Sequence, residues 1–64
     1  MSYLLFEIWT EEEDGHQELI DTTASKTEAI KIAEQSILDG SFAAVILQET
    51  EDGDLEEVLR FESD

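Results

Sequence analysis

The net charge of this chain limits most strongly what it can fold into. Its 64 residues carry 18 Asp and Glu side chains against 3 Lys and Arg, a formal net charge of −15 at pH 7. An acidic chain poor in apolar residues stays disordered, because it cannot bury enough surface to offset its loss of entropy. Here 41% of the residues are apolar, and they recur with regular periods. The pattern therefore predicts a folded chain, with disorder as the alternative.

Length and composition narrow the class of protein. A chain of about 60 residues buries only about 60% of the surface that it exposes when unfolded, so we expect a single domain, residues 1–64, with a thin core. It has no Cys and so no disulfide. The first residues lack the basic start of a signal peptide, and no apolar run reaches the roughly 20 residues that span a bilayer. We expect a cytoplasmic protein that binds neither membranes nor nucleic acid directly, because its charge repels phosphate.

Four segments have the composition of strands. The first is rich in aromatic and branched residues, the second is more polar, the third is almost wholly apolar, and the fourth is mixed. They cover residues 3–10, 17–23, 42–48 and 55–61. Asp14-Gly15 and Asp52-Gly53 predict tight turns between the paired segments, because Gly tolerates positive φ.

A helix is predicted between the second and third strands. Ser25 and Glu28 form a capping-box pattern, in which each side chain bonds the backbone amide of the other residue. Gly40 follows as a left-handed cap. The core-facing stripe consists of Ala29, Ile30, Ala33 and Ile37, with Ile32 and Leu38 beside it.

These elements predict an α+β fold of the order strand–strand–helix–strand–strand. The two most apolar strands should be central and the two more polar strands should be edges, where charges discourage unwanted pairing. The result is a four-stranded antiparallel sheet in the order 2-1-3-4, with one helix on one face and the two acidic turns at opposite ends. The order 2-1-4-3 is the alternative.

One helix covers only one face of such a sheet. Residues of one parity share a face, so Leu4, Phe6 and Ile8 oppose Tyr3, Leu5, Glu7 and Trp9. The third strand is likewise apolar on both faces, with Phe42, Ala44 and Ile46 against Ala43, Val45 and Leu47. In the fourth strand we expect Leu55, Leu59 and Phe61 on one side. Exposed contiguous apolar area marks interaction surfaces, so we expect an interface that includes Tyr3, Leu5 and Trp9.

No residue pattern predicts catalysis, a cofactor or a metal site. His16 is the only histidine, and no second catalytic group stands beside it in the sequence, so we expect a solvated turn residue and no enzyme. The best calcium candidate is the run from Glu49 to Asp54, but it departs from the EF-hand pattern at both ends. We therefore expect neither a bound metal ion nor a cofactor.

The two acidic turns resemble each other at a constant offset of 38 residues. The first set comprises Glu11, Glu13, Asp14, Gly15 and Glu18; the second comprises Glu49, Glu51, Asp52, Gly53 and Glu56. Acidic turns with Asp-Gly are common, so we interpret the match as shared turn chemistry. An internal duplication is the alternative.

The function that these features favour is a non-enzymatic protein-interaction domain. We expect it to form a homodimer through the helix-free sheet face, or to bind another protein of basic character. The alternative is an acidic mimic of nucleic acid that occupies the groove of a basic protein. The acidic surface for such contacts comprises Glu11, Glu12, Glu13, Asp14, Glu49, Glu51, Asp52, Asp54, Glu56 and Glu57.

Overall fold

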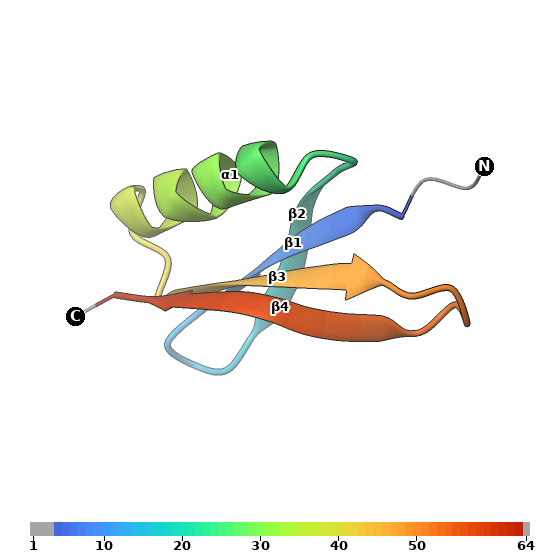
Figure 1. The fold of residues 1–64 in the computed structure, drawn as a ribbon. Helices are drawn as coiled ribbons and strands as arrows, with labels where there is room; N and C mark the ends of the chain where they lie inside the picture. Colours follow the sequence, from blue (N-terminus) through green and yellow to red (C-terminus); the bar gives the residue numbers. More distant parts are fainter. Residues whose placement is uncertain (1–3, 64) are drawn as a thin grey trace.

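The computed structural model describes residues 4–63 as one sheet and one helix (Figure 1). The elements are β1 (Phe6–Glu11), β2 (Gln17–Thr23), α1 (Lys26–Leu38), β3 (Ala43–Glu49) and β4 (Leu55–Glu62). All strand pairs are antiparallel and the strand order is β2-β1-β3-β4. The α+β fold and the order 2-1-3-4 are confirmed. The alternative order 2-1-4-3 was wrong.

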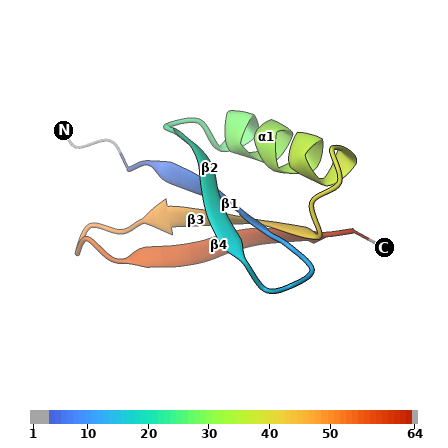
Figure 2. The same ribbon diagram turned by 180° about the vertical axis from the view of Figure 1, so that it is seen from behind.

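The helix covers one face of the sheet, and the two hairpin turns lie at opposite ends, as both ribbon views show (Figure 2). β1 and β3 pair antiparallel, and each runs into its own hairpin turn. The two turns therefore lie at opposite ends of the sheet. The opposite face of the sheet has no second layer in the described chain.

The core lies between α1 and the two central strands. Ile8 and Ile46 stand directly opposite each other, and both are 0% exposed. The buried cluster also includes Phe6, Ala44, Ala29 and Ala33. Because the two helical alanines have small side chains, the helix backbone approaches the sheet closely, and the larger Ile30, Ile32 and Ile37 pack around this contact. Leu38, expected beside the stripe, is instead 80% exposed, because five residues after Ala33 the helix has turned it away from the buried side.

The helix begins where the sequence predicts. The Ser25 hydroxyl accepts a hydrogen bond from the Glu28 amide at 3.3 Å, which satisfies one of the free donors of the first turn. The second half of the expected capping box is replaced. The Ser25 amide donates to the Thr23 hydroxyl at 3.1 Å instead of to the Glu28 carboxylate. A threonine at the end of β2 therefore joins the strand to the helix.

The helix ends in a Schellman motif. The Ser41 amide donates to the Ser36 carbonyl and the Gly40 amide donates to the Ile37 carbonyl, both at 3.1 Å. Gly40 has φ of +110°, as the predicted left-handed cap requires. The hydrophobic contact that usually accompanies this motif is replaced by a hydroxyl pair, Ser36 Oγ to Ser41 Oγ at 2.8 Å. This bond gives the hydroxyl of the buried Ser36 a hydrogen-bond partner at the edge of the core.

The two hairpins have the same register at the offset of 38 residues. Trp9 pairs with Leu19 in the first hairpin, and Leu47 pairs with Glu57 in the second. Each hairpin has a single register shift, and the shifts fall at equivalent places, after Ile8 and after Ile46. Each shift leaves one bulged residue on the edge strand, Ile20 and Val58 respectively. An identical bulge is a feature that turn chemistry does not dictate.

The turns repeat the same hydrogen bonds. The Glu12 amide donates to the His16 carbonyl at 2.8 Å, and the Thr50 amide donates to the Asp54 carbonyl at the same distance. The glycines that follow the acidic pairs, Gly15 and Gly53, have φ of +90° and +88°. Shared register, shared bulge and shared turns together favour the internal duplication over the simpler interpretation of common turn chemistry.

The bulge in β4 corrects one prediction about that strand. We expected Leu55, Leu59 and Phe61 on one side, but the bulged Val58 reverses the alternation between them. Leu59 pairs with Ile46 on the helix side, whereas Leu55 pairs with Glu49 and so lies on the helix-free face. An extra residue in a strand moves every residue beyond it to the other face.

Replacing Ser25 tests the start of the helix. We expect Ser25→Ala to lower the free energy of unfolding by about 0.5–2 kcal/mol, because the first turn loses an acceptor for the Glu28 amide. Ser25→Gly should lower the free energy of unfolding much less, since Gly lets water reach the free amides of the first helical turn. Urea denaturation of the three proteins measures the difference. Equal stability of the Ala variant and the unsubstituted chain would show that the cap contributes nothing.

Candidate functional site

The helix-free face of the sheet is the surface that the fold leaves without a second layer. Its middle contains three apolar side chains, Trp9 on β1 with Val45 and Leu47 on β3, and one carboxylate, Glu7, which stands opposite Leu47 and accepts from the Trp9 indole. Toward the ends, Glu11 pairs with Ala43, and the Glu49 amide donates to the Leu5 carbonyl at 3.0 Å, which places Glu49 opposite Leu5. The face therefore has an apolar centre of three side chains, with Glu7 beside it and further carboxylates toward both ends.

A shallow hollow of about 230 Å³ lies on this face. Side chains from all four strands line it: Trp9, Glu11, Gln17, Val45, Leu47, Glu57 and Arg60. It combines an indole ring, two aliphatic side chains and several charged groups. A hollow of this size is smaller than the roughly 300–1,000 Å³ of small-molecule sites, and it suits one side chain of another protein better than a whole ligand.

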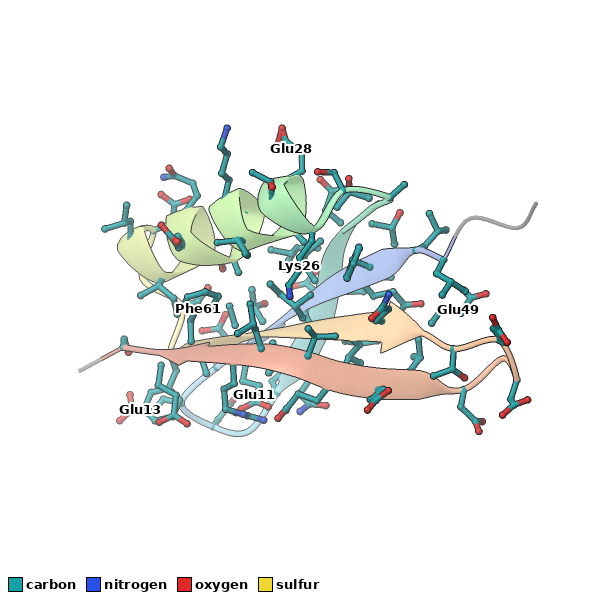
Figure 3. The ribbon with its side chains drawn as sticks, in the orientation of Figure 1. Glu11, Glu13, Lys26, Glu28, Glu49 and Phe61 are labelled. Atoms are coloured by element: carbon teal, nitrogen blue, oxygen red, sulfur yellow. The ribbon has the colours of Figure 1, made fainter. Side chains whose placement is uncertain are left out.

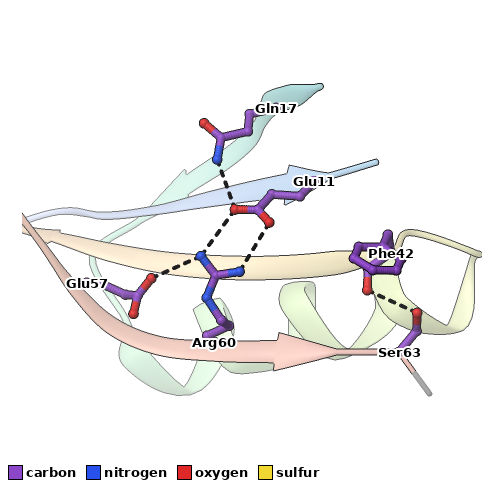
Figure 4. Close-up of polar contacts among 6 residues, drawn as sticks. All are labelled: Glu11, Gln17, Phe42, Glu57, Arg60 and Ser63. Atoms are coloured by element: carbon purple, nitrogen blue, oxygen red, sulfur yellow. Dashed lines mark hydrogen bonds and ion pairs between the residues drawn. The ribbon is translucent and has the colours of Figure 1, made fainter. Parts of the chain in front are cut away.

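Arg60 crosses this face and binds Glu11 with both arms of its guanidinium. Arg60 Nη1 donates to Glu11 Oε2 at 3.1 Å, and Nη2 donates to Glu11 Oε1 at 3.2 Å (Figure 4). Nη2 also donates to Glu57 at 3.3 Å, and Gln17 donates to Glu11 at 2.9 Å. We call these four residues the Arg60 clamp. Bidentate pairs of this type are the strongest hydrogen-bonded ion pairs in proteins.

The clamp covers part of the face that the sequence suggested would be bare. Arg60 projects from β4 and reaches Glu11 on β1, so its side chain spans β3, which lies between them. The β3 residues beneath it are already buried in the single chain: Val45 is 5% exposed and Ala43 is 1% exposed. The aliphatic part of an arginine commonly covers apolar surface in this manner while its head stays wet. A partner is therefore not needed to shield β3.

The clamp also changes the acidity of Glu11. Hydrogen bonds from Arg60, and next from Gln17, lower the pKa of the Glu11 carboxyl below its usual value. Both donors favour the ionised form. The clamp thus stabilises the ionised carboxylate of Glu11.

The predicted interface residues have different outcomes. Trp9 is half-buried, and its indole N–H donates to Glu7 Oε1 at 3.0 Å. Leu5 is 39% exposed at the edge of the face. Tyr3 lies outside the described residues. Two further leucines that sequence reasoning missed, Leu19 and Leu55, are 44% and 45% exposed on the same face. Their face follows from their pairing with Trp9 and Glu49, a hairpin register that the sequence alone does not give.

The predicted acidic surface is divided among three regions. Glu11, Glu49 and Glu57 lie on the helix-free face, whereas Glu56 pairs with Gln48 and points to the helix side. The remaining predicted residues are exposed at the two turns: Glu12, Glu13 and Asp14 in one, and Glu51, Asp52 and Asp54 in the other. Figure 3 shows Glu11 and Glu13 toward one end of the sheet and Glu49 toward the other.

His16 and the acidic turns were the features considered for catalysis or metal binding. The backbone amide of His16 donates to Asp14 Oδ1 at 2.9 Å, and the residue is exposed in its turn. Within residues 4–63, no three His, Asp or Glu side chains are arranged to hold a metal ion together. Nor does the described part of the chain contain a helix long and apolar enough to cross a membrane.

A second, larger groove of about 600 Å³ runs along the other face, beside the C-terminal half of α1. The bulged Ile20 and the half-buried Ile32 form its apolar part, and Lys31 lies among Glu12, Glu18 and Asp39 at its rim. The groove mixes charges of both signs around exposed apolar atoms. Nothing in its geometry singles out a reacting group.

Comparisons of the chain with protein-family models, with curated proteins and with solved structures each found no match.

The Arg60 clamp predicts a specific dependence of stability on pH. The pKa of Glu11 is lower in the folded chain than its ordinary value of 4.5, so the contribution is complete above that pH. It is lost as the pH falls through the lowered folded pKa. We expect the difference in free energy of unfolding between the unsubstituted chain and Arg60→Met to be constant at neutral pH and to shrink in this acid range.

Lys31→Met is the matched control, because it removes one positive charge from the helix side. Urea denaturation at several pH values, in salt that screens distant charges, measures both differences. A difference for Arg60→Met that persists unchanged at the acid end would contradict the clamp as the cause.

Proposed function

We propose that this chain is an acidic, non-enzymatic protein-interaction domain that contacts a basic protein through its helix-free face. The observation that carries the proposal is the arrangement of that face: an apolar centre of Trp9, Val45 and Leu47, with Glu7 bonded to the Trp9 indole beside it and Glu11 and Glu49 farther out. Aromatic and aliphatic side chains at the centre of a surface, with polar groups around them, are the usual composition of protein interfaces.

Charge favours a basic partner over a second copy of the chain. Two copies joined by a twofold axis would set the same face against itself, and this face carries carboxylates toward both ends. Arg60, the arginine of this face, already donates to Glu11 and Glu57, so each copy offers little free base to the carboxylates of the other. Each chain also brings a net charge of −15. The homodimer expected from the sequence remains a prediction, but like charges oppose it.

The acidic groups do not support an enzyme. The pKa of the Glu11 carboxyl shifts downward, away from the neutral range in which a general acid or base works best. The hollow beside it is shallow, and its other carboxylate, Glu57, is half exposed with a side-chain exposure of 52%. Binding by shape and charge is what such a face can do.

A mimic of nucleic acid is the weaker candidate. Such a protein needs its acid spread along one continuous surface that resembles a phosphate backbone. Here Glu28 and Glu34 lie exposed on the helix, on the opposite side of the sheet from Glu11 and Glu57. The acid surrounds the molecule instead of following one line.

A pair of neighbouring residues tests the face directly. Leu19 and Ile20 are adjacent in β2 and similarly exposed, at 44% and 41%, but they lie on opposite faces because successive strand residues alternate. We expect Leu19→Lys to weaken the binding of a short synthetic lysine–leucine peptide more than Ile20→Lys does. Both add the same charge to the same strand. The fluorescence of Trp9, the only tryptophan, reports binding.

Two different results would contradict the proposed function. Equal weakening by the two variants would show that the peptide is held by net charge and not by the helix-free face. Sedimentation of the chain alone at several concentrations and salt levels provides the second readout. A dimer that persists in high salt and dissociates in Leu19→Lys would identify a second copy as the occupant of the face.

A further inference from the structure

The repeated hairpins give the helix-free face an approximate twofold symmetry. Ile8 lies opposite Ile46, and these two residues are also equivalent at the offset of 38. A twofold axis perpendicular to the sheet between them therefore exchanges β1 with β3 and β2 with β4. The equal registers, bulges and turn hydrogen bonds of the two hairpins agree with this axis.

The same axis relates two pairs of similar groups on the helix-free face, whereas it exchanges unlike groups elsewhere, such as Glu7 with Val45 and Leu19 with Glu57. It exchanges Trp9 with Leu47, and both belong to the apolar centre. It also exchanges Glu11 with Glu49, so that each end of the face has one carboxylate on a central strand. Glu49 stands opposite Leu5, six residues before Glu11 on β1. At about 3.4 Å per residue, the two carboxylates lie about 20 Å apart along the strands.

We propose that the partner presents an apolar centre flanked on both sides by basic residues about 20 Å apart, a spacing that six residues of extended chain span. This inference rests on the proposed function and specifies its partner. A partner with base on one side only would leave either Glu11 or Glu49 facing apolar surface. A base on each side pairs both, and the apolar centre contacts Trp9 and Leu47.

The two carboxylates are not equally free. Glu11 is held by the Arg60 clamp, so an incoming guanidinium or ammonium shares it or displaces Arg60, whose side chain is 37% exposed. The side chain of Glu49 has none of the hydrogen bonds or ion pairs found among the described residues. Glu49 is therefore the cleaner position for a test, because its substitution does not disturb the clamp.

The test uses two synthetic peptides of identical composition. In the first, one lysine stands at each side of a leucine centre, six residues apart; in the second, both lysines stand at the same end. We expect the first peptide to bind the full chain more tightly, with a change in Trp9 fluorescence. Glu49→Gln should weaken the first peptide by about threefold, as expected for a half-exposed ion pair. It should have little effect on the second peptide when that peptide engages only Glu11.

Glu34→Gln is the matched control, because it removes the same charge from an exposed helical position. The inference is overturned if the two peptides bind equally well, or if Glu49→Gln and Glu34→Gln have the same effect while binding still depends on Leu19. That result would leave the proposed function standing with a different partner pattern. Binding of either peptide that is insensitive to Leu19→Lys would instead overturn the proposed function itself.

Discussion

The contact between Ile8 and Ile46 is the interaction on which the rest of this structure depends. These are the largest fully buried side chains, and they face each other at the centre of the β1–β3 pairing. Each belongs to a different hairpin, so this pair joins the two halves of the chain. It also provides the surface on which Ala29 and Ala33 of the helix pack. A small domain has few such contacts, and each therefore carries a large share of its stability.

The apolar surface of the sheet is covered in different ways on its two faces. On one face the helix buries the central strands with small alanines in close contact. On the other face a single arginine covers β3 by reaching across it to Glu11. This second cover is a side chain, itself 37% exposed, and not an element of structure.

The fold could be predicted from the sequence because each of its signals is local. The apolar composition of the segments around Ile8 and Ile46 placed them at the centre, and Ser25 and Gly40 marked the ends of the helix. The bulges at Ile20 and Val58 could not be predicted, because a bulge follows from pairing with a neighbouring strand. The Arg60 clamp joins residues 49 positions apart and has no local signature. The site was therefore predicted only in its outline, as an apolar sheet face with Trp9 in it.

Amide hydrogen exchange across the β1–β3 pairing tests the central role of this contact most directly. If Ile8 and Ile46 hold the two hairpins together as one cooperative unit, the protected amides of β1 and β3 should exchange with the same free energy of opening, equal to that of global unfolding. The edge strands β2 and β4 should exchange faster toward their ends. One hairpin exchanging through a separate opening of much lower free energy, while the other stays protected, would contradict this account.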